Sequence, residues 1–263
     1  SSHEHVASNL RMNTIEIKSF TELTELITSD EYTCGHYVYR GVSDTKNHKL
    51  IPAVGRIDEE ILCGLTIEEY ELETLNRFKL RANSEINPSP KDDWEWLALA
   101  QHHGLPTRLL DWTSSPLIAL YFATKPNILH NGKIEKCNPN GGAIFALHTC
   151  GYIDTSCIYS PFEFDEYGLF YPPHITKRIT GQFGLFSIQP NPREELQNGF
   201  EDDFAKTITK FTFSCDVAEE IQRKLYLLGI RHETVFPDLD GFSYDLKVKF
   251  NVTSCHTAES KCI

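Results

Sequence analysis

The sequence predicts a single α+β domain in which N-terminal helices pack on a mixed or antiparallel sheet. Helical apolar spacing is concentrated in the first half of the chain, whereas β-rich runs dominate the second half. A length of 263 residues with 40% hydrophobic side chains is enough for one large core. No apolar run approaches the roughly 20 residues that cross a bilayer, and no apolar signal segment opens the chain. We therefore expect a cytoplasmic protein without a membrane partner.

The charge balance excludes one broad mode of binding. The formal net charge is −12, which argues against a protein that coats nucleic acid or anionic lipid through its overall charge. A local basic cleft stays compatible with this balance. The first methionine is Met12, so we expect residues 1–11 to be a leader that does not belong to the protein and residues 12–263 to form the domain.

The eight cysteines are scattered, with no Cys-x-x-Cys pair. Zinc sites usually need such short spacings, because two ligands must reach one ion from the same turn. We therefore expect no metal site and, in a reducing compartment, free thiols rather than disulfides.

The first half of the chain alternates helices with short strands. Within residues 15–27, strand-like alternation is followed by the apolar spacing of a short helix. Residues 37–40 are expected to form a short strand that ends at Gly41, which puts Arg40 at a strand end. Thr66 and Glu69 resemble a capping box before a helix over 67–82. Two further helices are expected over 92–103 and, after Ser115-Pro116, over 117–123, whereas 107–112 fits a strand or a turn.

The second half is rich in predicted strands. A polar loop over 125–140 leads to strands at 142–147, 183–188, 205–213 and 245–252, with a helix at 218–228 before the last strand. Asp238 to Gly241 is expected to form a tight Asp-Gly turn between strands rather than a calcium loop, because the spacing of an EF-hand is absent.

Chemistry-bearing side chains are densest between two predicted helices. Residues 101–115 contain two histidines, one arginine, one aspartate and four hydroxyl side chains around a Gly-Leu-Pro turn. One interpretation is structural: Asp111 pairs with Arg108, and the hydroxyls cap the following helix. Together, however, these groups indicate a functional site. Its members are His102, His103, Thr107, Arg108, Asp111, Thr113, Ser114 and Ser115.

This stretch resembles the FRG domain, a family named for a Phe-Arg-Gly sequence that reads Tyr39-Arg40-Gly41 here. Residues 93–123 resemble the family's signature most closely, with His103 in place of the usual tyrosine. Further similar segments extend the resemblance over about residues 37–244: Leu50-Ile51-Pro52 with Arg56, Arg178-Ile179 with Gln182, Gly184 and Phe186, and Phe236 to Gly241.

A second resemblance is to ADP-ribosyltransferases, and it implies both a related fold and NAD as the substrate. The arginine, Ser-Thr-Ser and glutamate segments of those enzymes are similar to Arg40, to Thr113-Ser114-Ser115 and to the strand beginning at Gln182. The chain departs from that pattern because it has Gln182 where such enzymes carry glutamate, and Glu194 and Glu195 follow only after Pro190 and Pro192.

The resemblance implies specific roles for these residues. An arginine fork binds a pyrophosphate or orients a ribose. A carboxylate or polar oxygen stabilises the positive charge that develops on the ribose when the glycosidic bond breaks. The residues expected to bind NAD are Arg40, Gly41, Thr107, Arg108, Thr113 and Ser114, and those expected to act in catalysis are Arg40, His102, Asp111 and Gln182.

The sequence therefore predicts an NAD-dependent ADP-ribosyltransferase-like toxin or phage-defence effector that modifies a nucleic acid or protein acceptor, with an antitoxin as a further partner. If the acceptor is nucleic acid, Arg56, Lys79, Arg81 and Lys91 are the candidate contacts, with solvated helix charges as the plain alternative. Two other functions stay open: a non-catalytic nucleotide-sensing module, and a metal-dependent nuclease that uses His102 and Asp111. The sequence does not identify the acceptor, the partner or the oligomeric state.

Overall fold

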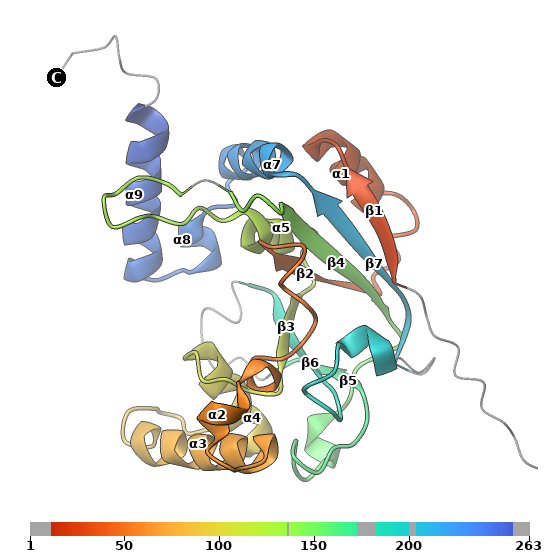
Figure 1. The fold of residues 1–263 in the computed structure, drawn as a ribbon, viewed down its shortest axis with the longest axis vertical. Coiled ribbons are helices and arrows are strands. Elements are labelled where there is room, and N and C mark those ends of the chain that lie inside the picture. Colours follow the sequence, from red (N-terminus) through yellow and green to blue (C-terminus); the bar gives the residue numbers. More distant parts are fainter. Residues whose placement is uncertain (1–11, 136, 173–181, 200–203, 255–263) are drawn as a thin grey trace, which may run out of the picture.

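The computed structural model describes residues 12–135, 137–172, 182–199 and 204–254, so the leader expected at 1–11 and the segment with Arg178 and Ile179 lie outside it (Figure 1). Its strands are β1 (Asn13–Ile17), β2 (Tyr37–Val42), β3 (Leu110–Thr113), β4 (Gly142–Thr149), β5 (Gly168–Phe170), β6 (Gly184–Ile188) and β7 (Ala205–Phe213). Its α-helices are α1 (Phe20–Ile27), α2 (Glu59–Leu62), α3 (Ile67–Ala82), α4 (Asp93–His102), α5 (Pro116–Thr124), α7 (Cys215–Leu227), α8 (His232–Val235) and α9 (Leu239–Ser254).

The described strands form one mixed sheet in the order β1-β7-β4-β2-β3-β6-β5. The β1–β7 pair is parallel and the other pairs are antiparallel. This architecture confirms the predicted α+β class. Strands β2, β3 and β6 are consecutive neighbours in the sheet, although they come from distant parts of the sequence.

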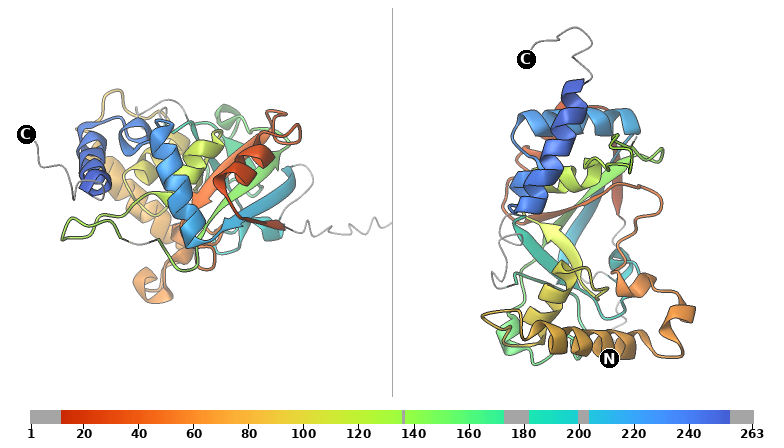
Figure 2. Two further views of the ribbon diagram at one scale, coloured as in Figure 1. Left: turned by 90° about the horizontal axis from the view of Figure 1, so that it is seen from above. Right: turned by 90° about the vertical axis from the view of Figure 1, so that its left-hand side faces the viewer.

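Helices cover the sheet in two groups at opposite ends of the molecule (Figures 1 and 2). Helices α1, α5 and α7 pack on one face, where Ile144 and Ala146 of β4 point into their core. The neighbouring Phe145 and Leu147 point into the core on the other face, as the alternation along a strand requires. A third core joins α3 and α4 to β5 and β6 through Trp94, among others. The first half of the chain therefore supplies only part of the helical cover, because α7 belongs to the C-terminal half.

Helices α3 and α4 begin at the capping residues that the sequence predicts. Thr66 Oγ1 accepts a hydrogen bond from the Glu69 backbone N–H at 3.1 Å, and the Glu69 carboxylate accepts one from the Thr66 N–H at 2.8 Å. The predicted capping box is thus confirmed. Asp92 caps α4 in the same way, with 2.9 Å between its Oδ1 and the Glu95 nitrogen. These caps join residues three positions apart, so the local sequence is enough to specify them.

Two local predictions were wrong. Residues 245–252 lie in helix α9 instead of a strand, and Asp238 to Gly241 leads into that helix instead of joining two strands. Asp238 Oδ1 accepts a hydrogen bond from the Gly241 N–H at 2.7 Å, which stabilises the turn at the start of α9. The apolar alternation from Leu246 to Val248 suits a strand, but packing of Val248 against neighbouring helices decides for a helix.

The strand that contains Arg40 is longer than predicted, because β2 continues through Gly41 to Val42. Gly41 does not end the strand. It allows helix α5 to approach, since a Cβ atom at this position would lie 1.8 Å from the Ala119 carbonyl oxygen. The segment that fitted either a strand or a turn forms β3, which pairs with β2 and β6.

No helix among the described residues has the length and apolar character needed to cross a membrane. The six cysteines of the described ranges are free thiols, and Cys255 and Cys262 lie outside those ranges.

Candidate functional site

A cleft of about 640 Å³ opens where β2 and β3 meet the end of α4 and the side of α5. Its walls include Tyr39, Arg40 and Gly41 of β2, and Asp111 and Thr113 of β3. Three more segments complete it: the loop that follows β2, the segment just before β6 and the turn between α8 and α9. They contribute Ser43, Asn47, His48, Lys49, Gln182 and Phe236. The volume lies within the range of small-molecule sites in proteins.

The cleft concentrates positive charge in an acidic chain. Arg40, Lys49, Arg56 and Lys125 line it, and within the described residues Asp111 is the one carboxylate that does so. Clustered cations in a concave wall raise the local concentration of anions. This local charge is the basic cleft that the net charge of −12 left open.

Arg40 is the most constrained of these cations. Its Nη1 donates a hydrogen bond to the Asp111 carbonyl oxygen at 2.6 Å and lies 3.5 Å from Asp111 Oδ2. Its Nε is buried and has no hydrogen-bond partner among the described residues. Because a buried donor without a partner is costly, Arg40 is a strong candidate to bind an anion in the cleft.

A chain of side-chain contacts holds Asp111 beside Arg40. Gln101 Nε2 donates to Asp111 Oδ2 at 3.0 Å and to the Leu109 carbonyl oxygen at 3.3 Å. Thr107 Oγ1 in turn donates to Gln101 Oε1 at 2.5 Å, which fixes the orientation of the amide. Sequence reasoning did not assign a role to Gln101, although it lies within residues 93–123, the segment most similar to the family signature.

Arg56 adds a second guanidinium to the cleft. Its Nη1 donates to the Ile51 carbonyl oxygen at 3.1 Å. Burial and the nearby charge of Arg40 lower the pKa of Arg56, whereas the charge of Asp111 acts in the opposite direction. Two guanidinium groups that repel one another provide a place where an anionic ligand would be stabilised.

Thr113 and Gln182 bring the predicted site segments together. Thr113 Oγ1 donates to the Gln182 carbonyl oxygen at 2.7 Å and accepts from the Ser115 N–H at 3.1 Å. The Thr113 hydroxyl therefore braces β3 against the segment before β6, where Gln182 lines the cleft. Ser114, predicted to bind NAD, is exposed but does not line the cleft.

His102 also lines the cleft, from the last residue of α4. The neighbouring His103 packs instead against Phe78, with 6.0 Å between the ring centroids. The two histidines of the motif therefore face different surroundings, and only His102 lies where a ligand of the cleft would contact it.

Thr107 and Arg108, both predicted to bind NAD, lie behind the cleft wall. Arg108 Nε is 2.8 Å from Glu71 Oε2, its backbone N–H donates to Glu71 Oε1 at 2.6 Å, and its guanidinium lies over the Phe162 ring. The structural interpretation that paired Arg108 with Asp111 was therefore wrong, because the partner is Glu71. Burial raises the pKa of Glu71, and the charge of Arg108 opposes that effect.

The loop after β2 supplies cleft residues that sequence reasoning missed. Asp44 anchors this loop by accepting hydrogen bonds from the backbone N–H groups of Lys46 and Asn47 and from the side chains of Asn47, Asn138 and Asn140. These bonds hold the pKa of Asp44 well below its usual range. The signal in the sequence was the Asp-x-x-Asn spacing of an Asx turn, but the two more distant asparagines give no such signal.

The remaining candidate cations do not line the cleft. Lys79 pairs with Asp93 at 2.6 Å and Arg81 with Glu85 at 2.6 Å, and Lys91 does not line the cleft either. Glu195 pairs with the cleft residue Lys49 at 2.7 Å. In the part of the chain that the structure describes, no three histidine, cysteine or acidic side chains gather closely enough to hold a metal ion.

Comparison with known proteins identifies one family. Residues 35–131, from the start of β2 to beyond α5, match the family model of the FRG domain. This segment contains Arg40, His102, Asp111 and Thr113, whereas Gln182 and Phe236 lie after it. No curated protein and no solved structure matches the chain.

Proposed function

Since the chain carries an FRG domain over residues 35–131, we propose that this protein binds NAD in the cleft of that domain and transfers ADP-ribose from it to a nucleic acid or protein acceptor. The observation that carries the proposal is the Arg40 guanidinium. It is held at one nitrogen by Asp111, while its buried Nε has no partner among the described residues.

The charge of the cleft supports a ligand with a pyrophosphate. Arg40 offers a preoriented fork, and charge-assisted hydrogen bonds to phosphate are stronger than neutral ones. Lys49, Arg56 and Lys125 add positive charge around it, and Lys125 forms no ion pair within the described ranges. The Phe122 and Phe236 rings, with centroids 6.0 Å apart, provide an apolar wall suited to an aromatic base.

The transfer requires a defined set of groups. The bond between nicotinamide nitrogen and ribose C1′ breaks, nicotinamide leaves with the electron pair, and the ribose gains positive charge. In this proposal Asp111 stabilises that charge, and the Gln182 amide oxygen adds a second partial negative charge. His102 accepts the proton that the acceptor loses as it forms the new bond to C1′.

Two observations favour a second candidate, a nucleotide sensor without catalysis. The Asp111 carboxylate is already engaged by Arg40 and by Gln101, and residue 182 is an amide rather than an acid. Both features suit binding better than stabilisation of a cation. The toxin or phage-defence setting and the antitoxin partner belong to the same proposal and rest on the family resemblance.

The test is release of nicotinamide and transfer of label from NAD, with RNA, DNA and protein lysate as separate acceptors. NAD affinity is measured in parallel by calorimetry. Arg40→Ala should weaken NAD binding by about 10- to 100-fold, the value of one or two charge-assisted hydrogen bonds. Asp111→Asn should abolish nicotinamide release with a smaller loss of affinity. Arg77→Ala, an exposed arginine on α3 paired with Glu73, is the matched control and should change neither.

Each outcome separates the candidates. Nicotinamide release that collapses in Asp111→Asn supports the transferase, and the labelled fraction identifies the acceptor class. NAD binding without release from any acceptor supports the sensor. Cleavage of RNA or DNA that requires a divalent cation and no NAD would support the nuclease instead. A protein that neither binds nor consumes NAD would refute the proposal.

A further inference from the structure

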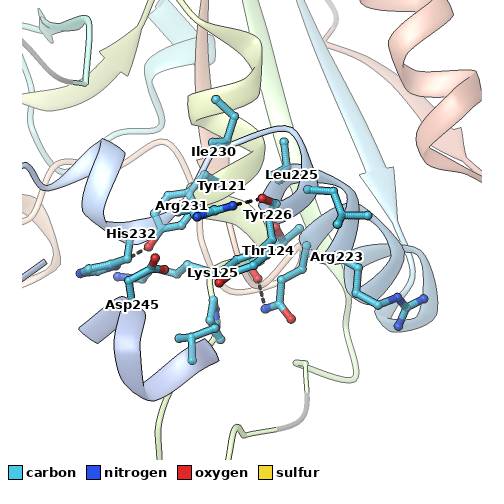
Figure 3. A pocket seen from close by; sticks show the side chains of 14 residues that line it. Tyr121, Thr124, Lys125, Arg223, Leu225, Tyr226, Ile230, Arg231, His232 and Asp245 are labelled. Carbon is cyan, nitrogen blue, oxygen red and sulfur yellow. Dashed lines mark hydrogen bonds between the residues drawn. The ribbon is translucent and has the colours of Figure 1, made fainter. Parts of the chain in front are cut away.

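A second cavity, of about 170 Å³, lies among α5, α7, α8 and α9 (Figure 3). Apolar side chains form much of its wall, including Tyr121 of α5, Leu225 and Tyr226 of α7, Ile230 in the turn that follows α7, and Val248 of α9. Three cations, Lys125, Arg223 and Arg231, line it as well. A dry apolar cavity of about 150 Å³ is large enough to hold benzene. This cavity therefore suits a ligand with one aromatic ring.

One carboxylate enters this apolar space. Figure 3 shows Asp245 of α9 reaching toward the cavity on the side of Tyr121 and His232. Asp245 is only 7% exposed. Among the described residues it forms no ion pair within 4 Å. The backbone N–H of His232 and the more distant charges of Arg231 and Lys249 favour its charged form, whereas burial opposes it. A buried carboxylate with so few donors has unused capacity to accept hydrogen bonds.

The neighbouring polar groups are directed elsewhere. Arg231 donates from Nε to the Tyr226 carbonyl oxygen at 3.2 Å, its guanidinium lies over the Tyr226 ring, and its Nη1 is 3.8 Å from Glu233. The His232 ring is hydrogen-bonded to the Tyr121 hydroxyl and stacks on Tyr244 at 4.0 Å. Asp245 thus faces the cavity with no cation within 4 Å among the described residues, although the charges of Arg231 and Lys249 act on it from farther away.

We propose that this cavity is a binding site for a small aromatic amine, whose ring fills the apolar space and whose protonated nitrogen binds the Asp245 carboxylate. The ligand cation would supply a direct charge partner closer to Asp245 than Arg231 and Lys249, and the tyrosine rings would add cation–π attraction. Apolar contact alone would favour the ring in any derivative, so selectivity for the amine is the signature of the site.

The site is separate from the proposed NAD cleft but shares a wall with it. Phe122, next to Tyr121 in α5, faces the cleft, and the cleft residue Phe236 stacks on His232 with 4.5 Å between centroids. Lys125 lines both spaces. Binding in the cavity does not depend on the proposed transfer reaction.

The test uses benzylamine, benzyl alcohol and benzoate, three probes with the same ring, measured by calorimetry and by thermal shift on the full chain. We expect benzylamine to bind at least tenfold more tightly than benzyl alcohol, and benzoate to bind least. Asp245→Asn should remove the preference for the amine. Asp240→Asn makes the same charge change on an exposed position of the same helix and should preserve it.

A second variant guards against a folding defect in Asp245→Asn. Val248→Phe places a ring in the cavity while the carboxylate stays, and it should weaken all three probes. Equal binding of amine and alcohol to the natural protein would overturn the proposal. So would an absence of binding, or an amine preference that survives in Asp245→Asn. NAD affinity, recorded in the same samples, reports separately on the cleft.

Discussion

Arg108 and Arg40 belong to two regions that use the same side chain in opposite ways. Arg108 is buried behind the cleft, where Glu71, the Pro161 carbonyl oxygen and the Phe162 ring all contact its guanidinium. Arg40 lies in the cleft wall, where Asp111 engages one nitrogen and the buried Nε has no partner among the described residues. In the first region the protein's own groups bind the guanidinium on several sides, whereas in the second region one buried donor has no protein partner among the described residues.

The comparison suggests a criterion that separates a structural arginine from one proposed to bind a ligand. Both arginines lie in motifs of the family and both are paired with a carboxylate, so residue type and proximity to acid do not separate them. What separates them is the number of donors that the fold satisfies. The proposed amine site applies the same criterion to a carboxylate, since Asp245 is buried and has no cation within 4 Å among the described residues.

The largest expected change in stability concerns the buried pair of Arg108 and Glu71. Glu71→Ala should lower the free energy of unfolding by about 3–5 kcal/mol, because it leaves a buried guanidinium without its partner. Glu73→Ala on the same helix removes an exposed pair with Arg77 and should cost less than about 0.5 kcal/mol. Urea denaturation measures both. Asp111→Ala, whose side chain is 59% exposed, should cost under about 1 kcal/mol, and a loss equal to that of Glu71→Ala would break the comparison.

A smaller loss of stability is expected from a substitution in strand β2, next to Arg40. Gly41→Ala would place a Cβ atom 1.8 Å from the Ala119 carbonyl oxygen, so strand β2 and helix α5 must separate. We expect a loss of about 1–3 kcal/mol in unfolding free energy, the usual cost of overpacking. Gly151→Ala meets no atom within 4 Å and should change stability by less than about 0.5 kcal/mol. A neutral Gly41→Ala in thermal and urea unfolding would contradict the close approach.

The smallest effect is a change with pH at the loop that borders the cleft. The hydrogen bonds to Asp44 lower its folded pKa below the unfolded value of about 3.9. The stability that this carboxylate contributes is therefore fully present above about pH 4 and is lost as the pH falls through the folded pKa. The stability difference between the natural protein and Asp44→Asn should accordingly shrink between pH 5 and pH 2, as followed by urea denaturation. A difference that stays constant over that range would show that the charge of Asp44 is not what anchors the loop.

Prediction from the sequence succeeded where the determining groups are neighbours along the chain. The capping box of Thr66 and Glu69 and the Asp92 cap depend on residues three positions apart, and the start of α5 depends on Ser115 and Pro116. The FRG resemblance, confirmed over residues 35–131, also rests on a continuous stretch of sequence. That stretch identified Arg40 and Asp111 before the structure brought them together.

The sequence by itself determined the α+β class, most element positions and the motif that surrounds the cleft, because local hydrogen bonds and apolar periodicity are encoded in nearby residues. Tertiary structure alone decided that Arg108 pairs with Glu71, 37 residues away, and that α9 is a helix. It also decided that Asp44 accepts hydrogen bonds from Asn138 and Asn140. The physical reason is that burial and long-range pairing depend on which surfaces meet after folding. Whether a buried arginine donor or a buried carboxylate has a partner is therefore decided only when the chain has folded.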